Sequence, residues 1–226
     1  MAAARAPEQP TLRERYRAQV RTEVKHAALR QLAEAGPAGL SVSAIGKELG
    51  VSGPALYRYF ANRDELLTEL IIDSYLDLAD ALTAATSGVR GQPRRTRLET
   101  LLRAFRSWAL AQPHRYRLLY GSPLPGYDAH AQRLVAASQA SMGVLLGILS
   151  ETGSRTPPLP GQPLASQLTA WAAANAFDTD AATALRAIDL WTRLHGIVSL
   201  EIAGNFASMG LDPDEFFEAQ IGALTA

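Results

Sequence analysis

The chain has 226 residues, which is enough for one large domain or two small ones, each with a buried core. It contains no cysteine, which excludes a disulfide framework, thiol catalysis and every cysteine-ligated metal site. Its 22 Lys and Arg residues balance 22 Asp and Glu residues, so net charge alone indicates neither a polyanion-binding protein nor an acidic disordered chain.

The balanced charge hides an uneven distribution along the chain. Up to Arg63 there are ten basic and five acidic residues, and the remainder carries the opposite excess. This distribution favours a basic N-terminal module that can meet phosphate, joined to a larger part that does not. The N-terminus lacks the apolar segment of a signal peptide, and the charge-free runs are too short or too rich in proline to span a bilayer. The sequence therefore predicts a cytoplasmic protein with no membrane partner.

Apolar residues recur at three- and four-residue spacings and Ala and Leu abound, so the chain is predicted to be all-α. In its first part, helices end at glycine or begin at a capping residue or proline. In chain order we expect helices over 12–35, 42–49 and 54–60, a break over 61–63, a long helix through residues 66–82 and a linker over 87–93.

The second part alternates helices with proline- and glycine-rich segments. We expect helices over 98–112, 116–120, 134–149 and 168–176, a loop over 123–126, a Pro/Gly-rich stretch over 153–163, a long helix capped by Asp178 or Thr179 and broken at Met209-Gly210, and a short helix after Asp212-Pro213.

Residues 41–60 have the pattern of a helix-turn-helix. Ile45 and Leu49 on the first short helix can pack against Leu56 and Phe60 on the second, with glycines in the turn between them. The outward face is small and polar, so the backbone at the start of the second helix can approach a duplex closely. By itself this pattern also fits an ordinary helical hairpin with surface tyrosines.

The stretch from residue 45 to residue 67, including Leu56-Tyr57-Arg58-Tyr59-Phe60, resembles the TetR family of one-component transcriptional regulators, and the resemblance covers about residues 21–70. The chain departs from the usual family pattern at Gly46, Tyr59 and Arg63, where Ala, His and Lys are common. The resemblance implies a DNA-binding helix-turn-helix domain over 21–70, a preceding arm or helix extension over 1–20, and a helical ligand-binding and dimerisation domain over 71–226.

The resemblance also implies which residues contact DNA. Groove or base-edge contacts would come from Ser43, Gly53, Pro54, Ala55, Tyr57 and Arg58, and phosphate contacts from Ser41, Tyr59 and Arg63. The charge of Arg13, Arg15, Arg17 and Arg21 suggests a further arm on the DNA backbone or minor groove; a solvated helix face is the alternative.

A second resemblance lies in the C-terminal part. The segments 108–123 and 190–201 are similar to the TetR subgroup named for a Trp-His-Gly signature, here Trp191, His195 and Gly196. Aromatic residues of this part are candidates for an effector pocket, although most of them would be core residues in an ordinary helical domain. The candidates are Phe105, Trp108, Tyr116, Tyr120, Trp171, Trp191 and His195.

The helix around residues 188–202 has two apolar stripes, so one is expected to meet its own domain and the other a partner subunit. The residues predicted for a dimer interface are Leu190, Leu194, Ile197 and Glu201.

Other chemistry has little support in the sequence. Glu23 and His26 form one E-x-x-H, but the second copy needed for a di-iron site is missing. Asp128 and His130 form a short acid–histidine spacing of a kind common by chance, and there is no nucleophile elbow or phosphate-binding glycine loop. No cofactor, metal or catalytic residue is predicted.

The prediction is therefore a regulator that binds a near-palindromic double-stranded operator as a homodimer and releases it when a small-molecule effector binds. Repression is the commoner outcome in the family that the sequence resembles, and an activator is the alternative. The alternatives are a helical ligand-binding protein without specific DNA binding and a small helical enzyme.

Overall fold

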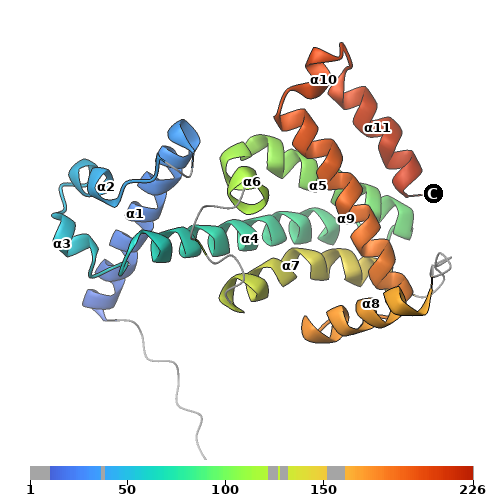
Figure 1. Ribbon diagram of the computed structural model, residues 1–226, viewed down its shortest axis with the longest axis horizontal. Helices are drawn as coiled ribbons and strands as arrows, with labels where there is room; N and C mark the ends of the chain where they lie inside the picture. Colours follow the sequence, from blue (N-terminus) through green and yellow to red (C-terminus); the bar gives the residue numbers. More distant parts are fainter. Residues whose placement is uncertain (1–10, 37–38, 122–126, 128–131, 152–160, 226) are drawn as a thin grey trace, which may run out of the picture. The chain divides into compact units, whose positions relative to one another are not determined.

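The computed structural model describes residues 11–36, 39–121, 127, 132–151 and 161–225, and in these residues every regular element is a helix (Figure 1). The all-α prediction is confirmed. The helices are α1 Leu12–Ala35, α2 Val42–Glu48, α3 Gly53–Leu56, α4 Arg63–Ser87, α5 Arg94–Ala111, α6 Pro113–Tyr120, α7 Gln132–Leu149, α8 Gln162–Ala174, α9 Ala181–Ile202, α10 Asn205–Ser208 and α11 Pro213–Leu224.

The chain divides into two compact units between Leu70 and Ile71. The first unit is Met1–Leu70 with Leu124–Tyr127, and the second is the remainder of the chain. Residues 12–20, predicted as an arm or helix extension, are the first part of α1. The predicted loop over 123–126, residues 1–10 of the predicted arm and most of the Pro/Gly-rich stretch lie outside the described residues.

The first unit is a small helical domain around an aliphatic core. A capping box begins α1, because the Thr11 side chain accepts from the Glu14 backbone N–H and the Glu14 carboxylate accepts from the Thr11 backbone N–H. α1 turns one apolar stripe inward, toward buried residues of α2, α3 and α4. The core residues are Val20, Val24, Ala27, Ala28, Leu32, Leu40, Val42, Ile45, Leu56, Phe60, Leu66, Leu67 and Leu70.

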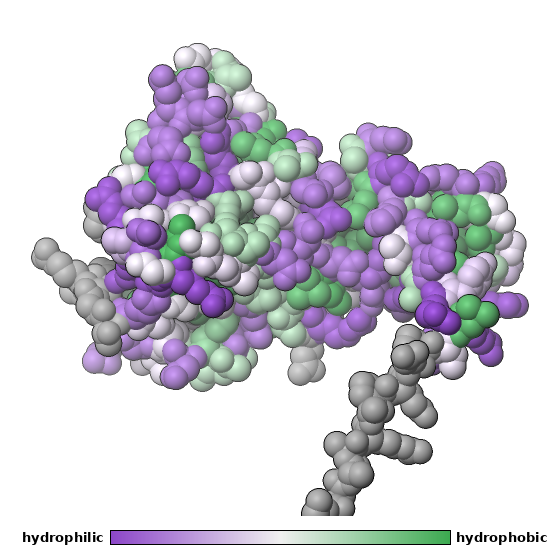
Figure 2. All heavy atoms as spheres, turned by 180° about the vertical axis from the view of Figure 1, so that it is seen from behind, coloured by the Kyte–Doolittle hydropathy of each residue, from purple (hydrophilic) through white to green (hydrophobic). Residues whose placement is uncertain are grey.

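The second unit is organised around α9. This helix packs against α5, α7 and α8 and, toward its end, against α10 and α11, which turns back alongside it (Figure 1). Leu102, Leu149, Leu190, Phe217 and Ile221 are among its fully buried side chains. On the face shown in Figure 2 hydrophilic residues are interspersed with smaller apolar patches, as expected when apolar stripes are turned inward.

Several predicted helix ends differ from the structure. α5, α6 and α8 begin at Arg94, Pro113 and Gln162, ahead of the predicted residues 98, 116 and 168. α9 is capped by Asp180, whose carboxylate accepts from the Thr183 N–H at 2.7 Å, and the predicted caps Asp178 and Thr179 lie just before it. α9 ends at Ile202, before Gly204 in a left-handed conformation (φ 77°), which is earlier than the predicted break at Met209-Gly210. The predicted break is present too, because α10 ends at Ser208, with Met209 as its C-cap before Gly210 (φ 71°). α3 ends at Leu56 and is followed by a turn, in which the Tyr59 N–H donates to the Leu56 carbonyl at 2.8 Å.

Candidate DNA interface and small-molecule pocket

The turn between α2 and α3 is closed by a backbone hydrogen bond. The Val51 N–H donates to the Gly46 carbonyl at 2.8 Å, and a Cβ atom on Gly46 would lie 2.8 Å from the Val51 oxygen. The absence of a side chain at Gly46 therefore allows the backbone at Val51 to approach it closely. Before α2, the Ser41 side chain accepts from the Ala44 N–H at 3.3 Å, so the predicted phosphate contact Ser41 is also the helix cap.

The predicted DNA contacts are brought together on the first unit by α2, α3 and the turn that follows. Ser43, Pro54, Tyr57 and Arg58 are exposed, and the Tyr57 side chain is 55% exposed although it is large and aromatic. Gly53, Ala55 and Tyr59 are half-buried. An exposed tyrosine and arginine beside a backbone with no bulky side chains form a surface that a DNA groove can accept.

Two arginines of α1 donate hydrogen bonds to the turn that follows α3. The Arg21 guanidinium donates to the Tyr59 carbonyl and lies 4.3 Å from the centre of the Phe60 ring. It also pairs with Glu69 of α4 at 3.3 Å, and Lys25 approaches the same carboxylate at 3.1 Å. Arg21 therefore has a positioning role within the unit, and its place in a DNA-contacting arm stays a prediction.

Arg17 makes a related contact. Its guanidinium donates to the Arg58 carbonyl at 3.3 Å, so it supports the same turn, although the residue is exposed on α1, as Arg13 and Arg15 are. Arg21 and Lys25 follow Arg17 at i, i+4 spacing on α1 and are half-buried beside the apolar stripe.

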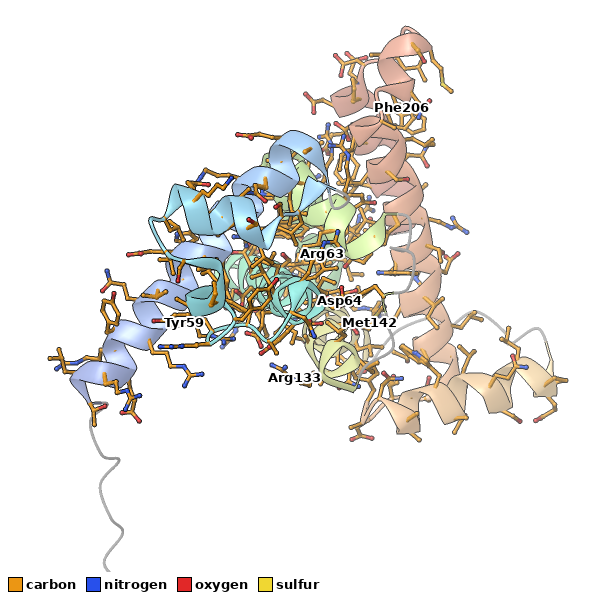
Figure 3. All side chains as sticks on the ribbon, turned by 60° about the vertical axis from the view of Figure 1, so that its left-hand side comes forward. Tyr59, Arg63, Asp64, Arg133, Met142 and Phe206 are labelled. Atoms are coloured by element: carbon orange, nitrogen blue, oxygen red, sulfur yellow. The ribbon has the colours of Figure 1, made fainter. Side chains whose placement is uncertain are left out.

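Arg63 links two parts of the first unit. Its Nε donates to the Leu40 carbonyl at 3.2 Å, so the start of α4 is tied to the residue before Ser41 (Figure 3 labels Tyr59 and Arg63). The side chain keeps 39% exposure. The predicted phosphate contact thus also fixes the position of the α2 cap.

Five of the predicted pocket residues form an aromatic cluster in the second unit. The rings of Tyr120 and His195 lie 4.1 Å apart and those of Trp191 and His195 4.6 Å apart, with Phe105 and Tyr116 in contact with the same histidine. The Tyr116 hydroxyl lies 3.1 Å from His195 Nδ1, a hydrogen bond. Burial lowers the pKa of His195 to about 4 and raises that of Tyr116 to about 12, so both side chains are uncharged at neutral pH.

Two adjoining cavities border this cluster. One of about 180 Å³ is lined by residues of α4, α6, α7, α8 and α9, among them Tyr120, Trp171 and Trp191. A smaller one of about 30 Å³ is lined by Phe105, Tyr120 and Trp191 with leucines of the core. Sequence reasoning missed the polar lining residues Ser138, Gln139, Ser141 and Asn175, because nothing in their local spacing distinguishes them from surface residues of the same helices.

Trp108 does not line either cavity. It is buried, and its indole N–H donates to the Asp77 carboxylate at 2.7 Å, while Arg115 pairs with the same carboxylate at 3.0 Å. Its position is that of a core residue with a satisfied polar group.

The predicted dimer-interface residues are engaged within the single chain. Leu190, Leu194 and Ile197 are buried in the core of the second unit, and Glu201 forms a bidentate ion pair with Arg106. These side chains are not available to a partner, so this prediction is wrong. Helical periodicity shows that a helix has two apolar stripes, but it does not show which stripe its own domain covers.

The E-x-x-H residues Glu23 and His26 are both exposed on α1. No group of three or more acidic or histidine side chains suited to a metal occurs in the part of the chain that the structure describes. The Asp128–His130 spacing lies outside that part. No helix within the described ranges is long and apolar enough to cross a membrane.

Comparisons with known proteins agree with the two-unit organisation. A family model described as bacterial regulatory proteins, tetR family, matches residues 26–70, and one described as a tetracyclin repressor-like C-terminal domain matches residues 98–224. The HTH-type transcriptional regulator Rv1816 of Mycobacterium tuberculosis is 35% identical over 216 residues, which are 93% of this chain and 92% of that protein.

Two solved structures are similar to this chain over most of its length. The crystal structure of regulatory protein SCO4313 has a TM-score of 0.80 at 40% identity and covers 95% of this chain and 98% of its own. A protein of unknown function from Rhodococcus sp. RHA1 has a TM-score of 0.70 at 28% identity, over 91% and 93% of the two chains. The Trp-His-Gly subgroup assignment stays a prediction.

Proposed function

Because the chain belongs to the TetR family of transcriptional regulators, we propose that it binds a near-palindromic DNA operator as a homodimer and releases it when a small molecule occupies its second unit. We also propose that it acts in the cytoplasm, where its operator is, and that it represses transcription, since a bound dimer obstructs the promoter it covers. It is a regulator by family, as its relatives are, and not an enzyme.

The observation that carries the proposal is the exposed Tyr57 and Arg58 beside the uncharged start of α3. Gly53 and Ala55 offer no side-chain hydrogen bond, so their contribution is close backbone approach, while Tyr57 and Arg58 reach phosphates or base edges. The arginines of α1 hold the turn that carries these two side chains in one conformation. A surface fixed in advance loses less conformational entropy on binding.

A homodimer places two such surfaces in successive major grooves, so the operator should show two-fold symmetry. Since Leu190, Leu194 and Ile197 are buried within one chain, the dimer proposal rests on family membership and on other residues. The exposed Leu200 of α9 is one apolar side chain that remains available to a partner. Effector binding lowers DNA affinity only if the effector prefers the conformation that does not bind DNA.

Selection of the full-length protein against random duplex DNA tests the proposal, with the mass of the same sample measured by light scattering. We expect an enriched near-palindrome and the mass of a dimer. Absence of enrichment at low salt, with the dimer intact, would instead support a helical ligand-binding protein without specific DNA binding.

A further inference from the structure

The larger of the two cavities beside the aromatic cluster is walled by aromatic rings. Tyr75, Tyr120, Trp171, Phe177 and Trp191 all line it. Tyr75 meets Tyr120 edge-on at 6.1 Å between ring centres, and Trp171 lies 5.4 Å from Phe177. Met142 completes the wall from α7 (Figure 3). Aromatic walls with a polarisable thioether favour a flat ring over a flexible chain.

The lining residues that the structure describes include no charged side chain. A ligand with a net charge would lose part of its water without gaining an ionic partner among them. Such desolvation is costly even for a single carboxylate. The occupant is therefore expected to be uncharged.

Three polar side chains of α7 present acceptors to the cavity. The Ser138 hydroxyl donates to the Val135 carbonyl at 2.8 Å, and the Ser141 hydroxyl donates to the Ser138 carbonyl at 3.2 Å. Gln139 uses its amide N–H on the Asn175 side-chain oxygen at 3.1 Å. The hydroxyl hydrogens of Ser138 and Ser141 are engaged, so their oxygens keep lone pairs for a ligand. The carbonyl oxygen of Gln139 does so too, and its amide group has a second N–H.

Volume limits the size of the occupant. An apolar cavity of about 150 Å³ holds one benzene molecule. The larger cavity here measures about 180 Å³ and adjoins the smaller one through Tyr120, Ser141, Met142 and Trp191. This space suits one or two fused rings.

We propose that the effector of this protein is an uncharged aromatic molecule of one or two rings that carries a hydrogen-bond donor. The role of this ligand as an effector rests on the proposed function, whereas the binding site itself does not depend on DNA binding. The donor would meet an oxygen of Ser138, Gln139 or Ser141, and the ring would lie between Trp171 and Trp191.

Three probes of similar shape test the proposal by calorimetry on the full-length protein: indole, benzofuran and indole-3-carboxylate. Indole is neutral and has an N–H donor, benzofuran is neutral without a donor, and indole-3-carboxylate is charged at neutral pH. We expect saturable binding of indole, binding of benzofuran weaker by about three- to tenfold through the missing hydrogen bond, and binding of the carboxylate weaker by at least about 100-fold.

A variant pair locates the site. Ser141→Leu fills the space where the two cavities adjoin and should abolish indole binding, whereas Ser107→Leu makes the same change on an exposed position of α5 and should leave it intact. Circular dichroism checks that both variants fold, and the comparison of the three probes on the unaltered protein stands without them. Equal binding of the carboxylate and indole, no saturable binding of indole, or undiminished indole binding by folded Ser141→Leu would overturn the proposal.

The same sample is then tested on the selected operator. If the protein binds the operator but not indole, the proposed effector class is wrong and the proposed function as a DNA-binding regulator is retained. Indole binding without any DNA binding would overturn the proposed function and leave the pocket assignment in place.

Discussion

Replacing Arg21 by alanine should destabilise the first unit through the turn that presents Tyr57 and Arg58. The change removes a charged hydrogen bond to the Tyr59 carbonyl and a guanidinium 4.3 Å from the Phe60 ring, while Glu69 keeps its pairing with Lys25. A hydrogen bond from a charged group contributes about 1.5–3 kcal/mol and a cation–π contact about 0.5–1 kcal/mol. Because one guanidinium makes both contacts, they are not additive, and we expect a loss of about 2–3 kcal/mol.

Urea unfolding measured with two probes can assign this loss to the correct unit. All three tryptophans, at positions 108, 171 and 191, lie in the second unit, so their fluorescence follows that unit, whereas circular dichroism follows both. Arg21→Ala should shift the circular dichroism transition to lower urea and leave the fluorescence transition in place. The matched control is Arg13→Ala on the exposed face of the same helix. Equal stability of the two variants would refute the positioning role of Arg21.

The remaining predictions concern DNA contacts, a buried histidine and a helix cap. Tyr57→Ala and Arg58→Ala should each weaken operator binding by about 1–3 kcal/mol with the dimer mass unchanged. If Arg58 meets a phosphate, the plot of log affinity against log salt concentration should have a slope smaller by about one for Arg58→Ala. Unaltered affinity in both variants would contradict the assigned DNA-binding face. Burial lowers the pKa of His195 from 6.5 to about 4, so below pH 6.5 the unfolded chain binds a proton that the folded chain does not. The free energy of unfolding of the second unit should therefore fall, by up to about 3 kcal/mol as the pH approaches 4, and His195→Gln should lose this part of the slope in tryptophan-monitored unfolding. Asp180→Ala should cost about 1 kcal/mol through the lost α9 cap, and Asp178→Ala should cost nothing measurable in the same assay.

Local pattern was sufficient to predict most helices. The first helix was predicted over 12–35 and is α1 Leu12–Ala35, because capping, apolar spacing and the terminal glycine all act within a few residues. The helix-turn-helix core of Ile45, Leu56 and Phe60 was predicted for the same reason, and all three are buried. Leu49 is only half-buried, because it lies at the C-cap of α2.

The features that could not be predicted depend on tertiary packing between residues far apart in the sequence. The role of Arg21 depends on the Tyr59 carbonyl and Glu69, which are 38 and 48 positions further along the chain, and no local rule links them. The two stripes of α9 could be seen in the sequence, but which of them its own domain covers depends on α5, α7 and α8. For the same reason the polar lining of the cavity, from Ser138 to Asn175, could not be predicted.

Equilibrium binding to the selected duplex and to a scrambled duplex of the same length and composition, measured across a salt series, tests whether the protein is a sequence-specific DNA-binding dimer. We expect the full-length dimer to prefer the selected duplex by about 10³-fold or more, with affinity for both duplexes falling as salt rises. Equal affinity for the two duplexes at every salt concentration would contradict this expectation.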